Sequence, residues 1–502
     1  MQASSLFLLA FLLACRGPET QSGESAEPSS GSGASSGERV SQPAQDSGRV
    51  LNRANPSERA QTREPELEII ATGLDVPWGM DLLPDGQLLV AERSGRITRI
   101  DPSTGKQTEL ARRPALDQGE GGLLGLVLDP EFGGSGSGAG SGGAGSGAGS
   151  GSGGAGSGAG SGGGSGGSGG VGSGSGAGSG GNKSSPYPYL YLYETTAEGN
   201  QIVRMRLEGD ALREDRVLLT GIPKARYHNG GVIRFGPDGY LYAGTGDGRE
   251  PFSAQDPNSL GGKVLRMTRD GEAVGGAGVG NGSAPGGRNG SGNGSAPGGR
   301  NGSGSGSAPG GTSGNGSAPG GTSGEAAASS PASPASLVYS LGHRNIQGLA
   351  WDADGNLYAT EHGPSGEING WCCHDEVNRI VQGGNYGWPH VIGDQTRGGC
   401  IQPLAHSGED TWAPGGCGVL SGSGWEQLEG HLITAGLRGQ HLRLFDLKTG
   451  KTSAIWFQDR LGRLRNVLVG PDGSVYFCSS NRDGRGRPQD GDDKIYRVKP
   501  AG

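Results

Sequence analysis

The chain is poor in aromatic residues, in long apolar runs and in clustered charge. The formal net charge is −8, and the charged residues are mixed along the chain. No basic face is interleaved with aromatic residues, which make up only 5% of the sequence, so nucleic acid is not an expected partner. The apolar run at 6–14 is too short to span a bilayer, and we expect no membrane-spanning helix. The rest of the chain shows no helical periodicity of useful length.

Glycine is what the chain has in excess. It supplies 108 of 502 residues, where roughly 7% is usual in globular chains. Most of the excess lies in two blocks, 133–182 and 273–330. These Gly/Ser/Ala/Pro tracts offer almost no apolar surface to offset the entropy of ordering, so we predict two long disordered insertions. A β-solenoid or collagen-like rod is the alternative, but no strict three-residue glycine period persists. Roughly 330 residues remain for one core.

The first residues have the features of a targeting segment. The apolar run ends in Leu-Leu-Ala immediately before Cys15, which resembles a bacterial lipoprotein signal over residues 1–15. Residues 16–66, rich in Ser, Gly, Glu and Pro, would then be a disordered tether. The alternative is an ordinary secretory peptide. We therefore expect an exported protein, periplasmic or held at the outer membrane through a lipid on Cys15.

The other cysteines favour disulfides over a metal site. In an exported protein pairing is the default, and the spacing does not match the paired C-x-x-C of a zinc site. Cys400 and Cys417 bracket a loop of plausible size for one bridge. Cys372 and Cys373 are adjacent and could bridge each other only through a strained turn, or each could find another partner. The connectivity stays open.

A short phrase recurs along the remaining chain. An apolar strand ends in a Pro-Asp-Gly type of turn and a β-rich strand follows, which is typical of antiparallel hairpins. The copies begin at Leu83, Gly236, Asp352 and Gly470. With the glycine-rich blocks set aside, the copies lie one or two units of roughly fifty residues apart, a spacing typical of β-propeller blades. The prediction is an all-β, six-bladed β-propeller over residues 67–502; a β-sandwich is the alternative.

Two residues in this region suit proton transfer. His228 precedes one of the hairpins, and Asp247 follows it nineteen positions later. A histidine gains or loses a proton near neutral pH, and a carboxylate behind it fixes its tautomer and raises its basicity. The sequence motif around Arg344 adds a fixed cation, and Gly363-Pro364 adds a carbonyl-rich turn. Together they suggest a redox site at the mouth of the barrel-like fold.

From Leu67 onward the chain resembles the soluble quinoprotein glucose/sorbosone (aldose sugar) dehydrogenase family. The phrases that carry the resemblance occur in order: G-L-D-V-P-W-G-M-D-L-L-P-D-G from Gly73, G-E-G-G-L-L-G-L-V-L-D-P-E-F from Gly119, the histidine clause at His228, G-K-V-L-R-M from Gly262, G-H-R-N-I-Q-G-L-A from Gly342, E-H-G-P from Glu361, G-G-N-Y-G-W-P from Gly383 and R-L-R-N-V-L-V-G-P-D-G from Arg463. The resemblance implies a six-bladed propeller that binds pyrroloquinoline quinone (PQQ) with Ca²⁺. It also implies a small sugar substrate and an external electron acceptor.

The resemblance also implies roles for the charged residues. His228 would take the proton of the sugar's anomeric hydroxyl while hydride passes to the quinone, and Asp247 would hold the imidazole. Arg344 would lie near the quinone oxygens with Asn345 as a neutral donor. The cofactor has three carboxylates, which planar guanidinium groups match well. Arg463 and Arg465, two positions apart on a strand, would reach it together.

Further residues follow from the same resemblance. The carbonyls of Gly363 and Pro364 would ligate Ca²⁺, which prefers oxygen ligands. Two cofactor-facing positions depart from the family pattern: Glu120 stands where Gln is frequent, and Arg438 stands where a Lys is usual.

Two other functions stay open. One is a surface-anchored propeller without catalysis that binds carbohydrate or protein. The other is a Ca²⁺-dependent hydrolase of the lactonase type, which would need Asp, Asn and Glu side chains around the metal rather than several arginines.

Overall fold

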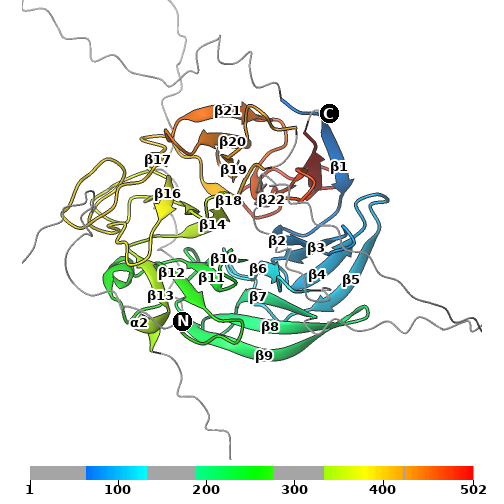
Figure 1. Cartoon of the computed structure of the whole chain (residues 1–502), viewed down its shortest axis with the longest axis horizontal. Helices are drawn as coiled ribbons and strands as arrows, with labels where there is room; N and C mark the ends of the chain where they lie inside the picture. The colour runs from blue at the N-terminus through cyan, green and yellow to red at the C-terminus, as the bar shows by residue number, and fades with distance from the viewer. Residues whose placement is uncertain (1–63, 133–187, 275–332, 422–423, 501–502) are drawn as a thin grey trace, which may run out of the picture. The chain divides into compact units, whose positions relative to one another are not determined.

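The described residues form a ring of six antiparallel sheets of four strands each. The computed structural model describes residues 64–132, 188–274, 333–421 and 424–500 (Figure 1). Blade 1 consists of β2 (Pro77–Leu82), β3 (Leu88–Glu92), β4 (Arg96–Ile100) and β5 (Gln107–Arg112); blade 2 of β6 (Leu123–Leu128), β7 (Tyr189–Thr195), β8 (Asn200–Glu208) and β9 (Ala211–Ile222); blade 3 of β10 (Gly230–Phe235), β11 (Leu241–Thr245), β12 (Lys263–Met267) and β13 (Val338–Leu341). Blade 4 consists of β14 (Ile346–Trp351), β15 (Leu357–Glu361), β16 (Glu376–Ile380) and β17 (Ala405–His406); blade 5 of β18 (Pro414–Val419), β19 (His431–Gly436), β20 (His441–Asp446) and β21 (Thr452–Trp456); blade 6 of β22 (Leu464–Val469), β23 (Val475–Ser479), β24 (Ile495–Val498) and β1 (Leu67–Ala71).

The first strand of each blade lines the middle of the ring. Around the ring, β2, β6, β10, β14, β18 and β22 each contact the next, and β22 contacts β2 (Figure 1). Blade 6 is completed by β1 from the beginning of the described chain, which pairs antiparallel with β24 from its end. The predicted six-bladed propeller is confirmed.

Helix is scarce in the described residues, which hold the 3₁₀ turn η1 (Pro251–Gln255) and the single turn α2 (Pro334–Leu337). No described helix has the length and apolar character that crossing a membrane requires.

The same irregularity recurs in all six first strands. Each shifts its register against the second strand near its start, at Pro77/Gly79, Leu123/Gly125, Gly230/Val232, Ile346/Gly348, Pro414/Cys417 and Leu464/Asn466. Glycine at this place lets neighbouring strands approach closely: a Cβ on Gly125 would lie 2.4 Å from the carbonyl oxygen of Gly231. Blade 6 has Asn466 instead, and its Nδ2 donates to the carbonyl of Trp78 in blade 1 at 2.6 Å.

The Pro-Asp-Gly phrases join first and second strands, as predicted. They connect β2 to β3, β10 to β11, β14 to β15 and β22 to β23. The predicted segment 1–15 and insertion 133–182 lie outside the described residues. So do the predicted tether 16–66, apart from 64–66, and the insertion 273–330, apart from 273 and 274.

The structure settles the pairing that the sequence left open. Cys372 and Cys373 form a disulfide with each other, whereas Cys400 and Cys417, whose loop length would allow a bridge, are both free. Cys417 is buried in β18 against Gly348 of blade 4, while Cys400 lies in a loop beside Gly387. Their side chains are held by different neighbours, which loop length alone does not reveal.

Candidate active site

The predicted site residues gather on the face of the ring opposite the Pro-Asp-Gly turns. β10 begins just after His228 and runs to the turn at 237–239, and β11 returns and ends just before Asp247. By the same strand order, Glu120, Arg344 and Arg463 precede or begin first strands, whereas Gly363 follows a second strand. In each blade, the loop before the first strand and the loop after the second strand therefore lie on the same face of the ring.

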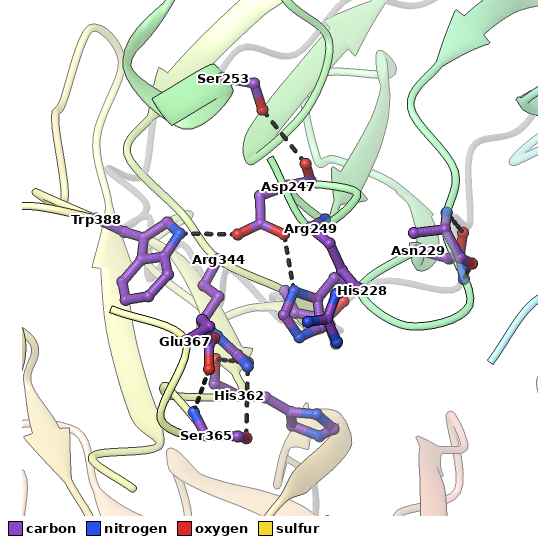
Figure 2. A network of polar contacts seen from close by, with 12 residues as sticks. His228, Asn229, Asp247, Arg249, Ser253, Arg344, His362, Ser365, Glu367 and Trp388 are labelled. Atoms are coloured by element: carbon purple, nitrogen blue, oxygen red, sulfur yellow. Dashed lines mark hydrogen bonds and ion pairs between the residues drawn. The ribbon is translucent and has the colours of Figure 1, made fainter. Parts of the chain in front are cut away.

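His228 and Asp247 form the hydrogen-bonded pair that the spacing predicted. His228 Nδ1 lies 2.8 Å from Asp247 Oδ1, and the backbone N–H of Arg249 donates to the same oxygen at 2.8 Å. Trp388 Nε1 donates to Asp247 Oδ2 at 2.9 Å (Figure 2). Burial alone would raise the pKa of Asp247, but its bond with His228 and the charge of Arg344 hold it below the usual range. An ionised Asp247 places the proton on Nδ1 and leaves Nε2 of His228 as the acceptor.

The backbone of His228 is held in an uncommon conformation. Its φ is 66°, in the left-handed region that non-glycine residues rarely adopt. Its N–H donates to Glu120 Oε2 at 3.0 Å, and its carbonyl accepts from the N–H of Gly248 at 3.1 Å. The other oxygen of Glu120 lies 3.1 Å from Arg485 NH1. Both oxygens of the predicted cofactor residue Glu120 therefore have protein partners in this structure.

Arg344 and Asn345 lie next to this pair, immediately before β14. Arg344 Nε is bonded to Glu367, its NH1 donates to the carbonyl of His362 at 3.1 Å, and the guanidinium lies 5.7 Å from the Trp388 ring centre (Figure 2). Asn345 is fully buried, and its Nδ2 has no hydrogen-bond partner among the residues that the structure describes. A buried unsatisfied donor is costly unless a bound group accepts from it.

Arg463, just before β22, and Arg465, within it, both approach the carboxylate of Asp483. Arg463 Nε donates to Asp483 Oδ2 at 2.8 Å, and Arg465 NH2 lies 3.7 Å from the same oxygen. The Arg465 guanidinium stacks 3.6 Å from the Trp78 ring centre and lines the central channel beside Gln347. Burial lowers the pKa of Arg465 to about 10, so it remains a cation at neutral pH.

Arg438 is not brought into this group. It lies in the turn between β19 and β20, on the same face, but its side chain is exposed. No polar contact joins it to the site residues within the described parts of the chain.

The structure adds residues that the sequence analysis gave no role. His362 directly precedes Gly363, and its buried Nε2 lacks a partner among the described residues. Burial and the charges of Arg344 and Arg465 lower the pKa of His362 to about 3, so its imidazole is neutral. The position of His362 in the E-H-G-P motif is the sequence feature that could have identified it as a site residue. Arg485 lies in a polar segment without a distinguishing pattern, and Trp388 lies in the G-G-N-Y-G-W-P motif, to which no site role was given.

The Gly363-Pro364 turn borders a pocket that is also lined by Arg344, Glu361, His362 and Glu376. The Pro364 carbonyl accepts the N–H of Cys373 at 2.8 Å, whereas no described residue donates to the Gly363 carbonyl. Burial and the neighbouring Glu361 raise the pKa of Glu376 to about 8. No group of three His, Cys, Asp or Glu side chains in the described ranges is arranged to hold a metal ion. A hard cation at this turn would therefore be coordinated by backbone carbonyl oxygens and by a small molecule bound together with it.

Fold and site together define a propeller with a hydrogen-bonded His–Asp pair beside buried cationic and neutral donors. The profile of the family described as glucose/sorbosone dehydrogenase matches residues 74–137, 183–285 and 318–495. The chain belongs to this family.

Solved relatives and a curated relative agree with this assignment. The putative oxidoreductase (glucose dehydrogenase) of Thermus thermophilus is 34% identical with a TM-score of 0.60, over 86% of this chain and 99% of that one. The PQQ-bound aldose sugar dehydrogenase of Streptomyces coelicolor is 31% identical with a TM-score of 0.58, over 87% and 99%. The aldose sugar dehydrogenase of Escherichia coli is 23% identical over 83% of this chain and 91% of its own length.

Proposed function

We propose that the protein oxidises an aldose sugar at its anomeric hydroxyl, giving the lactone, with PQQ as the first electron acceptor and His228 as the base. One observation carries the proposal: the Nδ1 of His228 is bound to an ionised Asp247, so its Nε2 is left as a proton acceptor. The similarity to glucose and aldose sugar dehydrogenases, one of them PQQ-bound, supports the reaction type and the cofactor.

The residues present fit a planar, polyanionic cofactor. Arg465 faces the channel with its closest carboxylate 3.7 Å away, and the buried Nδ2 of Asn345 and Nε2 of His362 lack partners in the described chain. These groups would hold carboxylate and quinone oxygens through charge-assisted and neutral hydrogen bonds. Arg344, fixed by Glu367 and the carbonyl of His362, would add a positive charge where negative charge develops. Arg463 would act through its pair with Asp483.

When bound, PQQ supplies the hydride acceptor, and Ca²⁺ held at the Gly363 and Pro364 carbonyls supplies Lewis acidity. His228 would accept the hydroxyl proton at Nε2, and Asp247 would stabilise the resulting imidazolium through Nδ1. An external acceptor would then take the electrons.

We also propose that the protein is exported and tethered through a lipid on Cys15. Radiolabelled palmitate should be incorporated into the wild-type protein but not into the Cys15→Ala variant.

The test is reconstitution of the purified protein with PQQ and CaCl₂, followed by dye-coupled oxidation of a panel of aldoses. His228→Gln should lower kcat by about 10²- to 10⁴-fold, the range of general-base catalysis, with PQQ affinity retained. No PQQ uptake by calorimetry with Ca²⁺ present would instead favour a binding module. Lactone cleavage by the PQQ-free protein would favour the hydrolase.

A further inference from the structure

The loop that carries Glu120 is joined to the segment that carries His228 by two hydrogen bonds. The backbone N–H of Glu120 donates to the carbonyl of Arg226 at 2.8 Å, and the N–H of His228 donates back to the Glu120 carboxylate at 3.0 Å. Gly119 packs so closely that a Cβ there would lie 2.1 Å from the Arg226 carbonyl oxygen. The loop before blade 2 and the loop before blade 3 therefore behave as one unit around the histidine.

Glu120 is held as an anion beside the imidazole. Burial would raise the pKa of its carboxyl, but the charge of Arg485 and the hydrogen bond from the N–H of His228 keep the pKa below its usual range. His228 therefore has two carboxylates near it. Asp247 contacts the ring itself, whereas Glu120 contacts the backbone of the same residue.

Arg485 forms an ion pair with this second carboxylate, Glu120. It comes from the connection between β23 and β24 in blade 6, and its guanidinium lies 4.9 Å from the Tyr227 ring centre. In the Arg485–Glu120 pair the arginine side chain is 51% exposed and the glutamate side chain 15%. One partner is thus open to solvent while the other lies within the site.

The charged and titratable groups around His228 come from several blades. The anions are Asp247 and Glu120; the cations are Arg485 and Arg344, and the charge of Arg344 also lowers the pKa of Asp247. His362 is neutral, and Tyr227 stacks with Arg485. Of the charged groups in this set, Glu120 and Arg485 can be changed without touching the contact between Asp247 and the imidazole.

We propose that Glu120 is a positioning residue for His228: it fixes the left-handed backbone of the histidine and adds a second negative charge beside the imidazole, which Arg485 attenuates. The proposal rests on the proposed role of His228 as base. The effect on the reaction is direct, because a nearby anion stabilises the imidazolium that forms when His228 accepts the proton, and a nearby cation opposes it.

The test uses Glu120→Gln and Arg485→Gln in the PQQ-free protein. Gln keeps an acceptor for the His228 N–H but removes the charge. The pKa of His228, followed by ¹⁵N-histidine NMR and assigned with His228→Gln, should fall by about 0.5–1 pH unit in Glu120→Gln. It should rise in Arg485→Gln. Asp117→Asn, in the same loop, and Arg487→Gln, an exposed neighbour of Arg485, are matched controls that should leave it unchanged.

The acid limb of kcat/KM in the PQQ-loaded enzyme should move in the same two directions. Shifts of the same sign, or no shift, in the two variants would overturn the proposal even if the enzyme turns over. Opposite NMR shifts without any sugar oxidation by wild type would instead overturn the proposed function and leave the positioning role standing. Because Arg485→Gln leaves Glu120 in place, poor folding of Glu120→Gln would not remove the test.

Discussion

Arg465 and Arg438 are the same residue type on the same face of the ring, but their surroundings differ. Arg465 is buried against Trp78 in the channel, and Arg438 is exposed. A charge-assisted hydrogen bond contributes about 1.5–3 kcal/mol, so Arg465→Met should weaken PQQ binding by about 10- to 100-fold. Arg438→Met should change it less than about threefold. Calorimetric titration with PQQ measures both, and a larger loss for Arg438→Met would contradict this assignment of the cofactor site.

At the residue scale, the sequence predicted contacts within one blade better than contacts between blades. His228 and Asp247 flank one hairpin, so the alternation of strands and turns places them at the same end. The bond between Glu120 and Arg485 joins positions 365 apart in the chain and depends on how a loop of blade 6 reaches the loop before blade 2 across blade 1. The exposure of Arg438 depends on the conformation of one turn, which a phrase match does not encode.

The irregular first strand is the element that sets how closely neighbouring blades approach. A Cβ on Gly416 in β18 would lie 1.7 Å from Asn466 Oδ1 in β22. Gly416→Ala should therefore destabilise the fold by about 1–3 kcal/mol, the usual cost of overpacking. Gly398→Ala, where the added Cβ would meet nothing within 4 Å, is the control and should stay within about 0.5 kcal/mol. Equal urea midpoints for the two variants would refute this account.

The segment that holds the Cys372–Cys373 disulfide packs against the Gly363-Pro364 turn, where we propose that Ca²⁺ binds. Cys373 donates its N–H to the Pro364 carbonyl, and the Cys373 carbonyl lies where a Cβ on Gly363 would come within 1.8 Å. Replacing Cys372 and Cys373 by Ser should loosen this contact and raise the Ca²⁺ concentration that gives half-maximal turnover. Cys400→Ser, which removes a free thiol elsewhere in blade 4, should not raise it. Identical Ca²⁺ titrations for the double variant and wild type would argue against the support.

At the element scale, four hairpins could be predicted from the sequence and two could not. The strands β6 and β7 are separated by the block that begins at 133, so the short turn signal is absent there. The other missed hairpin joins β18 to β19 in blade 5, where residues 420–430 contain no turn of the Pro-Asp-Gly type. The blade count nevertheless followed from the spacing, because the period of a propeller survives irregular blades.

The stability of the whole protein should depend on pH through one buried acid, Glu376. Glu376 has a pKa of about 8 in the folded protein and an ordinary value near 4.5 when unfolded. The folded state then binds more protons between these values, so this group's contribution to stability is complete below about pH 4.5 and is lost as pH rises through 8. The Tm of Glu376→Gln relative to wild type should therefore increase from pH 5 to pH 8. The exposed Glu426→Gln should show no such trend.

The ring is closed by its two ends, since β1 completes the sheet whose last strand is β24. During translation, blades 1 to 5 can assemble as their strands emerge, but the final seam must wait for Val498. A ribosome-bound chain that stops short of β24 would expose an unpaired strand edge on each side of the gap, a surface that chaperones and aggregation both recognise.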